Sequence, residues 1–296
     1  MPELPEVETV VRELRPRLVG RKIHKVFVSA QRLRGKWSPA WKTALVGRRI
    51  LGVWRRGKWI IFDLTGPSHL VFHLGMTGRL TIFRALTPIE VHTHLRFLLD
   101  RGQEELRFRD IRRFGSATYF NDRASLDLFF QDKSLGPEPF SLESEYWHKK
   151  LLSTDRCLKA VLLDQTVVAG VGNIYADESL FRARLNPARV GRKTTLRESE
   201  RLRRAIIAVL RDAITKRGSS IRDFVGGSGR EGEYQREFRV YGQTGEPCPR
   251  CRSPIACMRL AGRSTHFCVR CQPERVVKNG ASTGAPSRSM NRGRRN

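Results

Sequence analysis

Acidic side chains are scarce in this sequence. Aspartate and glutamate together number 29 among 296 residues, against 56 lysines and arginines, so the formal net charge is +27. A chain with such an excess of positive charge seeks a polyanion or an anionic surface. Long apolar runs are also missing, because the longest one, 205–210, has six residues, whereas a membrane-spanning helix needs about twenty. The sequence therefore excludes membrane insertion and favours nucleic acid as a partner.

A secretion signal is equally absent from the start of the chain. The first ten residues carry three glutamates and no apolar block, whereas a signal peptide is basic and then apolar. We therefore expect a cytoplasmic, intracellular protein whose thiols stay reduced. The composition is 40% hydrophobic and 8% aromatic, which is enough for ordinary cores, and the length suits two domains with attachments.

Hydrophobic periodicity divides the chain into parts. Residues 1–18 predict an amphipathic helix that Pro16 closes, and 21–120 predict short strands separated by turns, as in an antiparallel sandwich or barrel. Beyond residue 121 apolar residues recur at three- and four-residue steps, which is the pattern of helices. The fold class is α+β, with a β-sandwich domain over 1–121, a helical domain over 122–225, a mobile Gly-rich loop over 226–246, a cysteine module over 247–272 and a disordered basic tail over 273–296.

Four of the six cysteines form two Cys-x-x-Cys pairs that lie sixteen residues apart: Cys248, Cys251, Cys268 and Cys271. This spacing is typical of two knuckles that hold one tetrahedral Zn²⁺. Four thiolates leave no open position, so we expect one structural zinc per chain. The residues between the pairs predict a hairpin with its tip at 261–263. Cys157 and Cys257 are interpreted as small buried residues.

The terminus Met1-Pro2-Glu3 offers a nucleophile. Removal of Met1 would leave Pro2 with a free secondary amine, and α-amino groups have a pKa near ~8, far below that of lysine. Such an amine can attack an electrophilic sugar carbon and form an iminium, while Glu3 moves protons. A proline-rich terminus alone more often simply starts a helix, so both interpretations stay open at this point.

Six further blocks, in a fixed order over residues 1–272, accompany the terminus Met1-Pro-Glu-Leu-Pro-Glu. They are Gly57-Lys58, His73-Leu-Gly-Met-Thr-Gly78, Asp110-Ile-Arg-Arg-Phe-Gly115, Gly170-Val-Gly-Asn-Ile-Tyr-Ala176, Val240-Tyr-Gly242 and Gly262-Arg-Ser-Thr-His-Phe-Cys-Val-Arg-Cys-Gln272. Together these blocks resemble the formamidopyrimidine-DNA glycosylases. Leucine at position 4, rather than glycine, favours this branch over endonuclease VIII.

The resemblance implies a helix and β-sandwich followed by a helix–two-turns–helix domain with a zinc ribbon. It also implies a bifunctional enzyme of base excision repair. Such an enzyme removes oxidised purines, such as 8-oxoguanine and formamidopyrimidines, and cleaves the abasic strand by β- and δ-elimination. We accordingly expect a nucleoid-associated bacterial monomer whose partner is double-stranded DNA containing oxidised bases or abasic sites.

The residues that the resemblance singles out are Pro2, Glu3, Lys58 and Arg263 for the reaction, and His73, Met76, Arg112, Phe114, Asn173, Tyr241 and Arg263 for contacts to DNA. An enzyme that acts on a base in a duplex extrudes the nucleotide, and something must fill the gap. Met76, Arg112 and Phe114 supply a wedge, a hydrogen-bonding guanidinium and a stacking ring. Taken singly, Met76 and Phe114 are better interpreted as core residues, although the glycines next to them favour exposure at strand ends, and His73 fits a core histidine equally well.

One position departs from the family pattern, because Ile111 stands where the family commonly has proline, so we expect a less rigid loop there. The loop over the extruded base is expected within 218–236, and 273–296 is interpreted as a non-specific DNA tether. Three alternatives stay open: an endonuclease VIII-like glycosylase for oxidised pyrimidines, a non-catalytic zinc-ribbon DNA-binding protein, and an RNA-associated basic protein.

Overall fold

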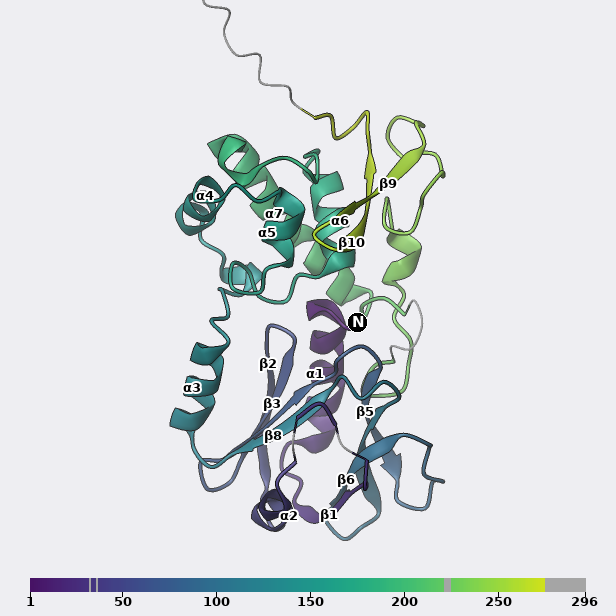
Figure 1. The fold of residues 1–296 in the computed structure, drawn as a ribbon. Coiled ribbons are helices and arrows are strands. Elements are labelled where there is room, and N and C mark those ends of the chain that lie inside the picture. The colour runs from purple at the N-terminus through teal and green to yellow at the C-terminus, as the bar shows by residue number, and fades with distance from the viewer. Residues whose placement is uncertain (32, 36, 221–224, 275–296) are drawn as a thin grey trace, which may run out of the picture.

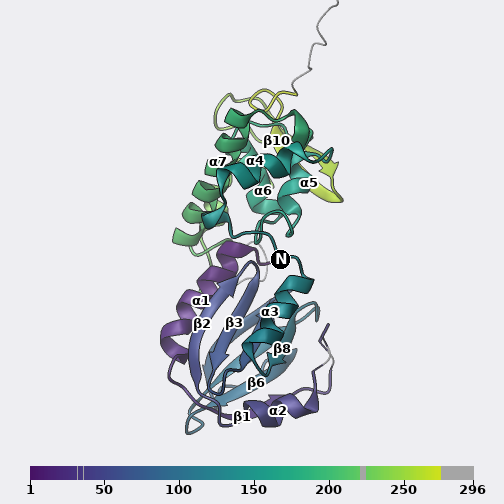
Figure 2. The same ribbon diagram turned by 90° about the vertical axis from the view of Figure 1, so that its left-hand side faces the viewer.

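The chain folds into two lobes that meet at the N-terminal end of helix α1 (Leu4–Leu18), as Figures 1 and 2 show. The computed structural model describes residues 1–31, 33–35, 37–220 and 225–274. One lobe is a β-sandwich, and the other contains helices and the C-terminal hairpin. Within these described ranges no helix is long and apolar enough to cross a membrane. Most of the expected DNA tether, 275–296, lies outside the described residues.

Helix α1 belongs to both lobes. Its apolar side chains recur at three- and four-residue steps and are buried, as the sequence predicts. Leu4 packs in the core of the helical lobe, whereas the residues from Val7 to Leu18 pack in the core of the sandwich. The prediction that Pro16 closes the helix is wrong by two residues, because a proline in the last turn costs a single hydrogen bond and the helix continues to Leu18.

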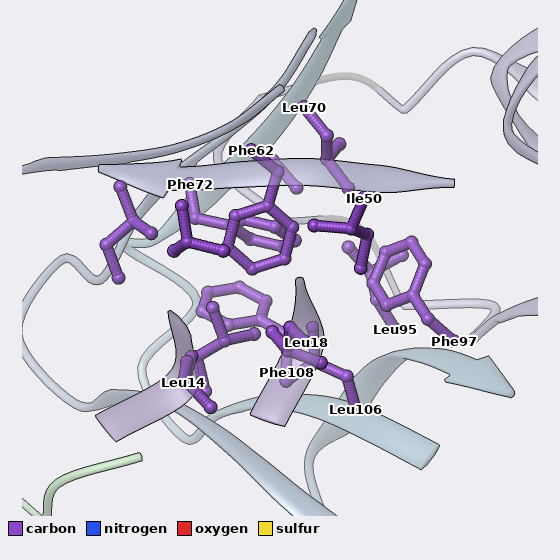
Figure 3. Packing of buried hydrophobic residues seen from close by; sticks show 14 of the residues in the cluster. Leu14, Leu18, Ile50, Phe62, Leu70, Phe72, Leu95, Phe97, Leu106 and Phe108 are labelled. Atoms are coloured by element: carbon purple, nitrogen blue, oxygen red, sulfur yellow. The ribbon is translucent and has the colours of Figure 1, made fainter. Parts of the chain in front are cut away.

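Two four-stranded antiparallel sheets form the sandwich. One has the order β1 (Ile23–Val28), β6 (Thr93–Leu99), β7 (Glu104–Asp110) and β5 (Gly78–Arg84), and the other has the order β2 (Ile50–Arg56), β3 (Trp59–Leu64), β4 (His69–His73) and β8 (Ser116–Phe120). Between them Phe72 contacts the rings of Phe62, Phe97 and Phe108, with centroids 5.4–5.9 Å apart (Figure 3). Ring contacts at this distance stabilise the core beyond what burial of the ring surface alone contributes.

Two short helices flank the sandwich. The sequence does not predict α2 (Pro39–Leu45), because seven residues with one fully buried side chain, Leu45, show no helical period. Helix α3 (Arg123–Asp132) lies on the outer face of the β2-β3-β4-β8 sheet (Figure 2), where Leu126 packs among aromatic rings of the sheet. Strands therefore give way to helices near residue 122, whereas the chain leaves the sandwich for the helical lobe only after α3.

The helical lobe contains α4 (Ser144–Leu152), α5 (Leu158–Leu163), α6 (Asn173–Arg182) and α7 (Leu196–Thr215), with 3₁₀ turns η1 (Pro139–Ser141), η2 (Gly191–Lys193) and η3 (Tyr234–Glu237). Thr195 and Glu198 form a capping box at the start of α7. Helix α7 packs against α6, α4 and α1. In the stretch expected to be a mobile loop, Tyr234 and Val240 are buried.

Strands β9 (Ile255–Leu260) and β10 (Arg263–Cys268) form the predicted hairpin. Ala261 and Gly262 both have positive φ, 49° and 72°, which is typical of a two-residue hairpin turn. The expectation that both spare cysteines are buried is wrong. Cys257 is exposed because it lies on the outward face of β9, and Cys157 is half-buried.

The buried carboxylate of Glu178 on α6 fixes the chain that leads into the hairpin. It accepts three consecutive backbone N–H groups, those of Arg239 at 3.1 Å, Val240 at 3.0 Å and Tyr241 at 2.9 Å. Burial raises the pKa of Glu178, and the three hydrogen bonds oppose that rise. Removal of this side chain would leave three N–H groups without their acceptor.

We predict that Glu178→Ala lowers the free energy of unfolding by about 2–4 kcal/mol, because several buried donors lose one charged acceptor. Glu178→Gln keeps an acceptor oxygen and should lower the free energy of unfolding less than Glu178→Ala does. Denaturant unfolding followed by circular dichroism measures both, with Glu145→Ala on the exposed face of α4 as the control. Equal stability of Glu178→Ala and the control would contradict the role given to this carboxylate.

Candidate active site and zinc site

The N-terminal segment lies buried where the two lobes meet. Pro2 and Glu3 are buried, whereas 54% of Met1 is exposed. The backbone N–H of Leu4 donates to the carbonyl of Gly170 at 3.0 Å. Gly172 lets the side chain of Glu3 lie against the backbone before α6, because a Cβ atom at that position would lie 2.3 Å from Cδ of Glu3. The glycines that precede α6 thus make room for the start of the chain.

The carboxylate of Glu3, just before α1, caps helix α6. Its Oε1 accepts the N–H of Ile174, in the first turn of α6, at 3.0 Å, where the helix presents unpaired donors and a positive dipole end. Oε2 is buried and has no hydrogen-bond partner among the described residues. Burial raises the pKa of Glu3, while the charge of Lys58 opposes the rise. Glu3 is therefore a carboxyl group suited to hold and release a proton.

Lys58 lies in the tight turn between β2 and β3 and is only 7% exposed. Its Nζ donates to the carbonyl of Val171 at 3.1 Å, beside the glycine that contacts Glu3. Burial lowers the pKa of Lys58, the charge of Glu3 raises it, and the charge of Arg263 lowers it further. This buried ammonium group is therefore not a solvated surface lysine, and it lies in the electrostatic field of both Glu3 and Arg263.

Glu138 holds the Lys58 turn in place. Its Oε1 accepts the N–H of Gly57 at 2.6 Å and the guanidinium of Arg56 at 3.0 Å, and Oε2 pairs with Arg55 at 2.7 Å. One carboxylate from the loop after α3 thus accepts two hydrogen bonds from the β2–β3 turn and pairs with Arg55 by charge. The turn is fixed by charge-assisted hydrogen bonds rather than by its own sequence alone.

Glu6 connects the start of α1 with the segment that follows α7. Its Oε2 accepts the N–H of Glu3 at 2.8 Å. Its Oε1 accepts the N–H of Ser219 at 2.8 Å and the hydroxyl of Tyr175. Sequence reasoning did not single out Glu6, because Tyr175 and Ser219 lie more than 160 residues away from it and a first-turn glutamate is common in any helix.

The start of α6 and the tip of the hairpin are joined. Nδ2 of Asn173, the first residue of α6, donates to the carbonyl of Ser264 at 3.0 Å. Oδ1 of Asn173 has no partner among the described residues. Arg263, which precedes Ser264, is exposed. The positive dipole end of a helix beside an arginine forms an environment suited to a phosphate.

A buried acid, Asp177, sets the position of the hairpin on α6. Its Oδ2 accepts the backbone N–H of His266 at 2.9 Å and contacts Nδ1 of the same ring at 3.1 Å. Its Oδ1 pairs with Lys159 of α5, and both side chains are fully buried. Lys159 also donates to the carbonyl of Asn173 at 3.0 Å. The only sign of this role in the sequence is a pair of adjacent acids, 177–178, inside a helix that also has apolar residues. The sequence analysis therefore did not predict the role of Asp177.

Two turns at the edge of the sandwich present the expected gap-filling side chains. Met76 is 38% exposed and Phe114 is 42% exposed, so neither belongs to the core. The guanidinium of Arg112 lies over the Phe114 ring, 4.8 Å from its centroid. The buried carboxylate of Asp110 joins the two turns, because it accepts the hydroxyl of Thr77 at 2.5 Å and the N–H of Gly115 at 2.7 Å.

Ile111 is exposed in the second of these turns. The neighbouring N–H of Arg112 donates to the hydroxyl of Thr77 at 3.0 Å, and Asp110 holds the other end of the turn. The turn is thus fixed from the positions on either side of Ile111. A reduced rigidity at this position stays a prediction.

His73 and Tyr241 have packing roles in the structure. The ring of His73 lies 4.6 Å from the Trp59 ring, and its Nδ1 accepts the N–H of Gly75 at 3.0 Å. Burial lowers the pKa of His73 to about 4, so the imidazole is neutral near pH 7. The ring of Tyr241 lies edge-on between Phe238 and His266. Contacts of these two side chains to DNA stay predictions.

The four predicted metal ligands come together at the base of the hairpin. The Sγ atoms of Cys248, Cys251, Cys268 and Cys271 all lie within 4.8 Å of one another. Two of the distances, 3.8 Å and 3.4 Å, are close to the separation of about 3.8 Å that tetrahedral Zn–S bonds of about 2.3 Å require. The N–H groups of Arg250 and Cys271 point at ligand sulfurs at 3.4 Å. The residues fit one structural zinc ion.

We expect elemental analysis to find about one zinc per chain, and Cys268→Ser to reduce this content strongly because four-thiolate sites need all their ligands. Cys257→Ser on exposed β9 is the matched control and should keep its zinc. The assignment fails if the two variants retain equal amounts of metal.

A second prediction concerns the buried pair of Lys159 and Asp177. Asp177→Ala should cost about 3–5 kcal/mol of unfolding free energy, because it leaves Lys159 buried without its counter-charge. Adding Lys159→Met removes that charge and should recover most of the loss. Chemical denaturation of the single and double variants measures this coupling. A double variant less stable than Asp177→Ala would argue against it.

Models of three domain families match the chain. The formamidopyrimidine-DNA glycosylase N-terminal domain matches residues 1–117, the formamidopyrimidine-DNA glycosylase H2TH domain matches 135–225, and a zinc finger found in FPG and IleRS matches 245–273. Together these matches cover most of the sandwich, the helical lobe and the hairpin. The α+β fold inferred from the resemblance is confirmed.

Curated relatives match nearly the whole chain. The formamidopyrimidine-DNA glycosylase of Heliobacterium modesticaldum is 45% identical over 278 residues, and that of Geobacillus kaustophilus is 43% identical over 277 residues. Each match covers 92% of this chain and 100% of the relative.

Solved structures match as well. The Lactococcus lactis Fpg in complex with abasic-site DNA has a TM-score of 0.87, and the same protein with Fapy-dG-containing DNA has one of 0.85. Both are 37% identical, and each match covers 92% of this chain and 100% of the solved one. By sequence and by structure, this chain belongs to the formamidopyrimidine-DNA glycosylase family.

Proposed function

We propose that this protein is a bifunctional DNA glycosylase and abasic-site lyase of base excision repair, which acts on oxidised purines such as 8-oxoguanine and formamidopyrimidines. The observation that carries the proposal is the convergence of Pro2, Glu3 and Lys58 on the start of α6 at the junction of the lobes. An amine, a carboxyl group and an ammonium group in one buried place suit attack on a sugar carbon.

The first step is nucleophilic displacement. With Met1 removed, the nitrogen of Pro2 attacks C1′ of the damaged nucleotide, the glycosidic bond breaks, and its electron pair leaves with the base. Opening of the sugar ring then gives an iminium between Pro2 and C1′, and the ring oxygen takes a proton. The raised pKa of Glu3 makes it the group that supplies this proton.

Strand cleavage follows from the iminium. Because the iminium withdraws electrons, the C2′ proton can be lost, and β-elimination expels the 3′ phosphate. A second loss of a proton allows δ-elimination of the 5′ phosphate. Hydrolysis of the iminium then regenerates the amine of Pro2. Lys58 and Arg263 contribute positive charge beside the phosphates that leave.

The exposed side chains at the edge of the sandwich fill the gap that the extruded nucleotide leaves in the duplex. Met76 and Phe114 enter the stack, and Arg112, held over the Phe114 ring, bonds to the base left unpaired. Asn173 and Arg263 hold the phosphate backbone on the side of the helical lobe. The zinc ion keeps the hairpin that carries Arg263 closed at its base and takes no part in the reaction.

DNA as substrate also leads us to propose the bacterial nucleoid as the location of this protein.

We expect borohydride to trap a covalent adduct between the wild-type protein and lesion-containing duplex DNA, because reduction fixes the iminium. Pro2→Gly should give markedly less adduct. Mass spectrometry should find active protein without Met1, since an amide nitrogen cannot form the iminium. Active material that keeps Met1, or an undiminished adduct from Pro2→Gly, would exclude Pro2 as the nucleophile.

Glu3→Gln should slow base excision by about a hundredfold or more, as removal of an acid–base group does, while binding of the duplex changes little. Single-turnover assays with 8-oxoguanine, formamidopyrimidine and oxidised-pyrimidine duplexes measure this effect and the substrate preference together. Preference for the pyrimidines would support the endonuclease VIII-like alternative. Absence of any strand cleavage would support a DNA-binding protein without catalysis.

A further inference from the structure

The carbonyl oxygen of Val171 accepts hydrogen bonds from two side chains. Nε2 of Gln165, in the turn after α5, donates at 2.8 Å, and Nζ of Lys58 donates at 3.1 Å. Val171 is fully buried. A carbonyl oxygen has two lone pairs, so these two donors together satisfy it. An ammonium group of the site and a side-chain amide thus share one acceptor.

The side chain of Gln165 also holds the backbone next to Val171. Its Oε1 accepts the N–H of Gly170 at 2.8 Å, and its Nε2 donates to the carbonyl of Leu163 at 3.1 Å as well. The backbone carbonyl of Gln165 accepts the N–H of Gly136 at 2.9 Å. The amide group is therefore held in place by backbone groups and does not depend on Lys58.

The backbone that Gln165 holds also receives the start of the chain. The carbonyl of Gly170 accepts the N–H of Leu4 at 3.0 Å. Gly170 has φ of 88°, and a Cβ atom there would lie 2.6 Å from the side chain of Leu4, so this approach needs glycine. Gln165 thus acts on a stretch of backbone that contacts both the N-terminal segment and Lys58.

The contact of Lys58 inside the protein has to be given up when its charge is used elsewhere. The proposed function uses this charge beside the phosphates that leave, whereas in the structure the ammonium group donates to the Val171 carbonyl. A buried carbonyl that loses its donor costs free energy. With Gln165 in place, the carbonyl keeps one donor when Lys58 turns away. Without Gln165, the same movement leaves the carbonyl unpaired.

We infer that Gln165 is a positioning residue, which keeps the Val171 carbonyl hydrogen-bonded while the ammonium group of Lys58 turns from this carbonyl to a phosphate of the bound DNA. The inference rests on the proposed function, in which Lys58 acts on that phosphate. Gln165 acts through the backbone of Val171 and needs no contact with the substrate.

The first experiment uses abasic DNA and two variants near ~pH 8, where a glutamate is ionised. Gln165→Leu removes both groups of the amide, whereas Gln165→Glu keeps the acceptor for Gly170 and removes the donor to Val171. Both should bind a duplex with a tetrahydrofuran abasic analogue about five- to a hundredfold more weakly, the range for one buried carbonyl left unpaired. Single-turnover cleavage of a natural abasic site should slow by a similar factor. An effect in Gln165→Leu alone would assign it to Gly170 and overturn the inference.

A double variant separates this role from a general structural one. In Lys58→Met no ammonium group has to turn away, so adding Gln165→Leu should change the affinity for the abasic analogue by less than about twofold. In the protein that keeps Lys58, the same change weakens binding as stated above. An equal loss of affinity with and without Lys58 would overturn the inference, because a structural defect does not depend on that side chain.

Gln131→Leu, the same change at an exposed position of α3, is the matched control and should bind as the wild-type protein does. Denaturant midpoints show that every variant is folded. Wild-type affinity and cleavage rate in Gln165→Leu would also overturn the inference. Failure of the proposed function is distinguishable, because the wild-type protein would then cleave no abasic site.

Discussion

The carboxylate of Glu3 at the start of α6 is the contact on which the arrangement of the site depends. It connects the N-terminus of the chain with a helix that begins 170 residues later, at the junction of the two lobes, where the neighbouring Leu4 packs in the same core as that helix. Because α1 has side chains in both cores, the lobes share one rigid element. The N-terminal end of the chain is therefore held by packing on one side and by a helix cap on the other.

Seven of the 29 acids of this basic chain are buried among the described residues. Each holds a loop or a turn through backbone N–H groups or a buried cation, as the wholly or nearly buried carboxylates show: Glu3, Glu6, Glu105, Asp110, Asp177, Glu178 and Glu198. These buried carboxylates add no negative charge to the surface, where arginine and lysine are in excess because the whole chain has 56 of them against 29 acids. A single sequence property, the scarcity of acids, thus serves both the precision of the site and the attraction of a polyanion.

The sequence predicted elements whose signals are local. Alternating apolar residues located the strands of the sandwich, the period of α7 located the longest helix, and the cysteine spacing located the zinc hairpin. The roles of Asp110, Asp177 and Glu178 were not predictable in this way, because their partners are backbone groups brought near only by the folded chain. The short helix α2 and the outward-facing Cys257 were missed for the same reason, since neighbouring residues do not determine them.

The burial of Pro2 restricts how the chain can be extended. Met1 is exposed, yet the next residue already lies between the lobes, with Glu3 within hydrogen-bond distance of α6. A purification tag attached ahead of Met1 would keep the proline nitrogen in a peptide bond, so it could not act as a free amine. Any added sequence is therefore compatible with this architecture at the opposite end of the sequence, where it leaves the proline nitrogen unaltered.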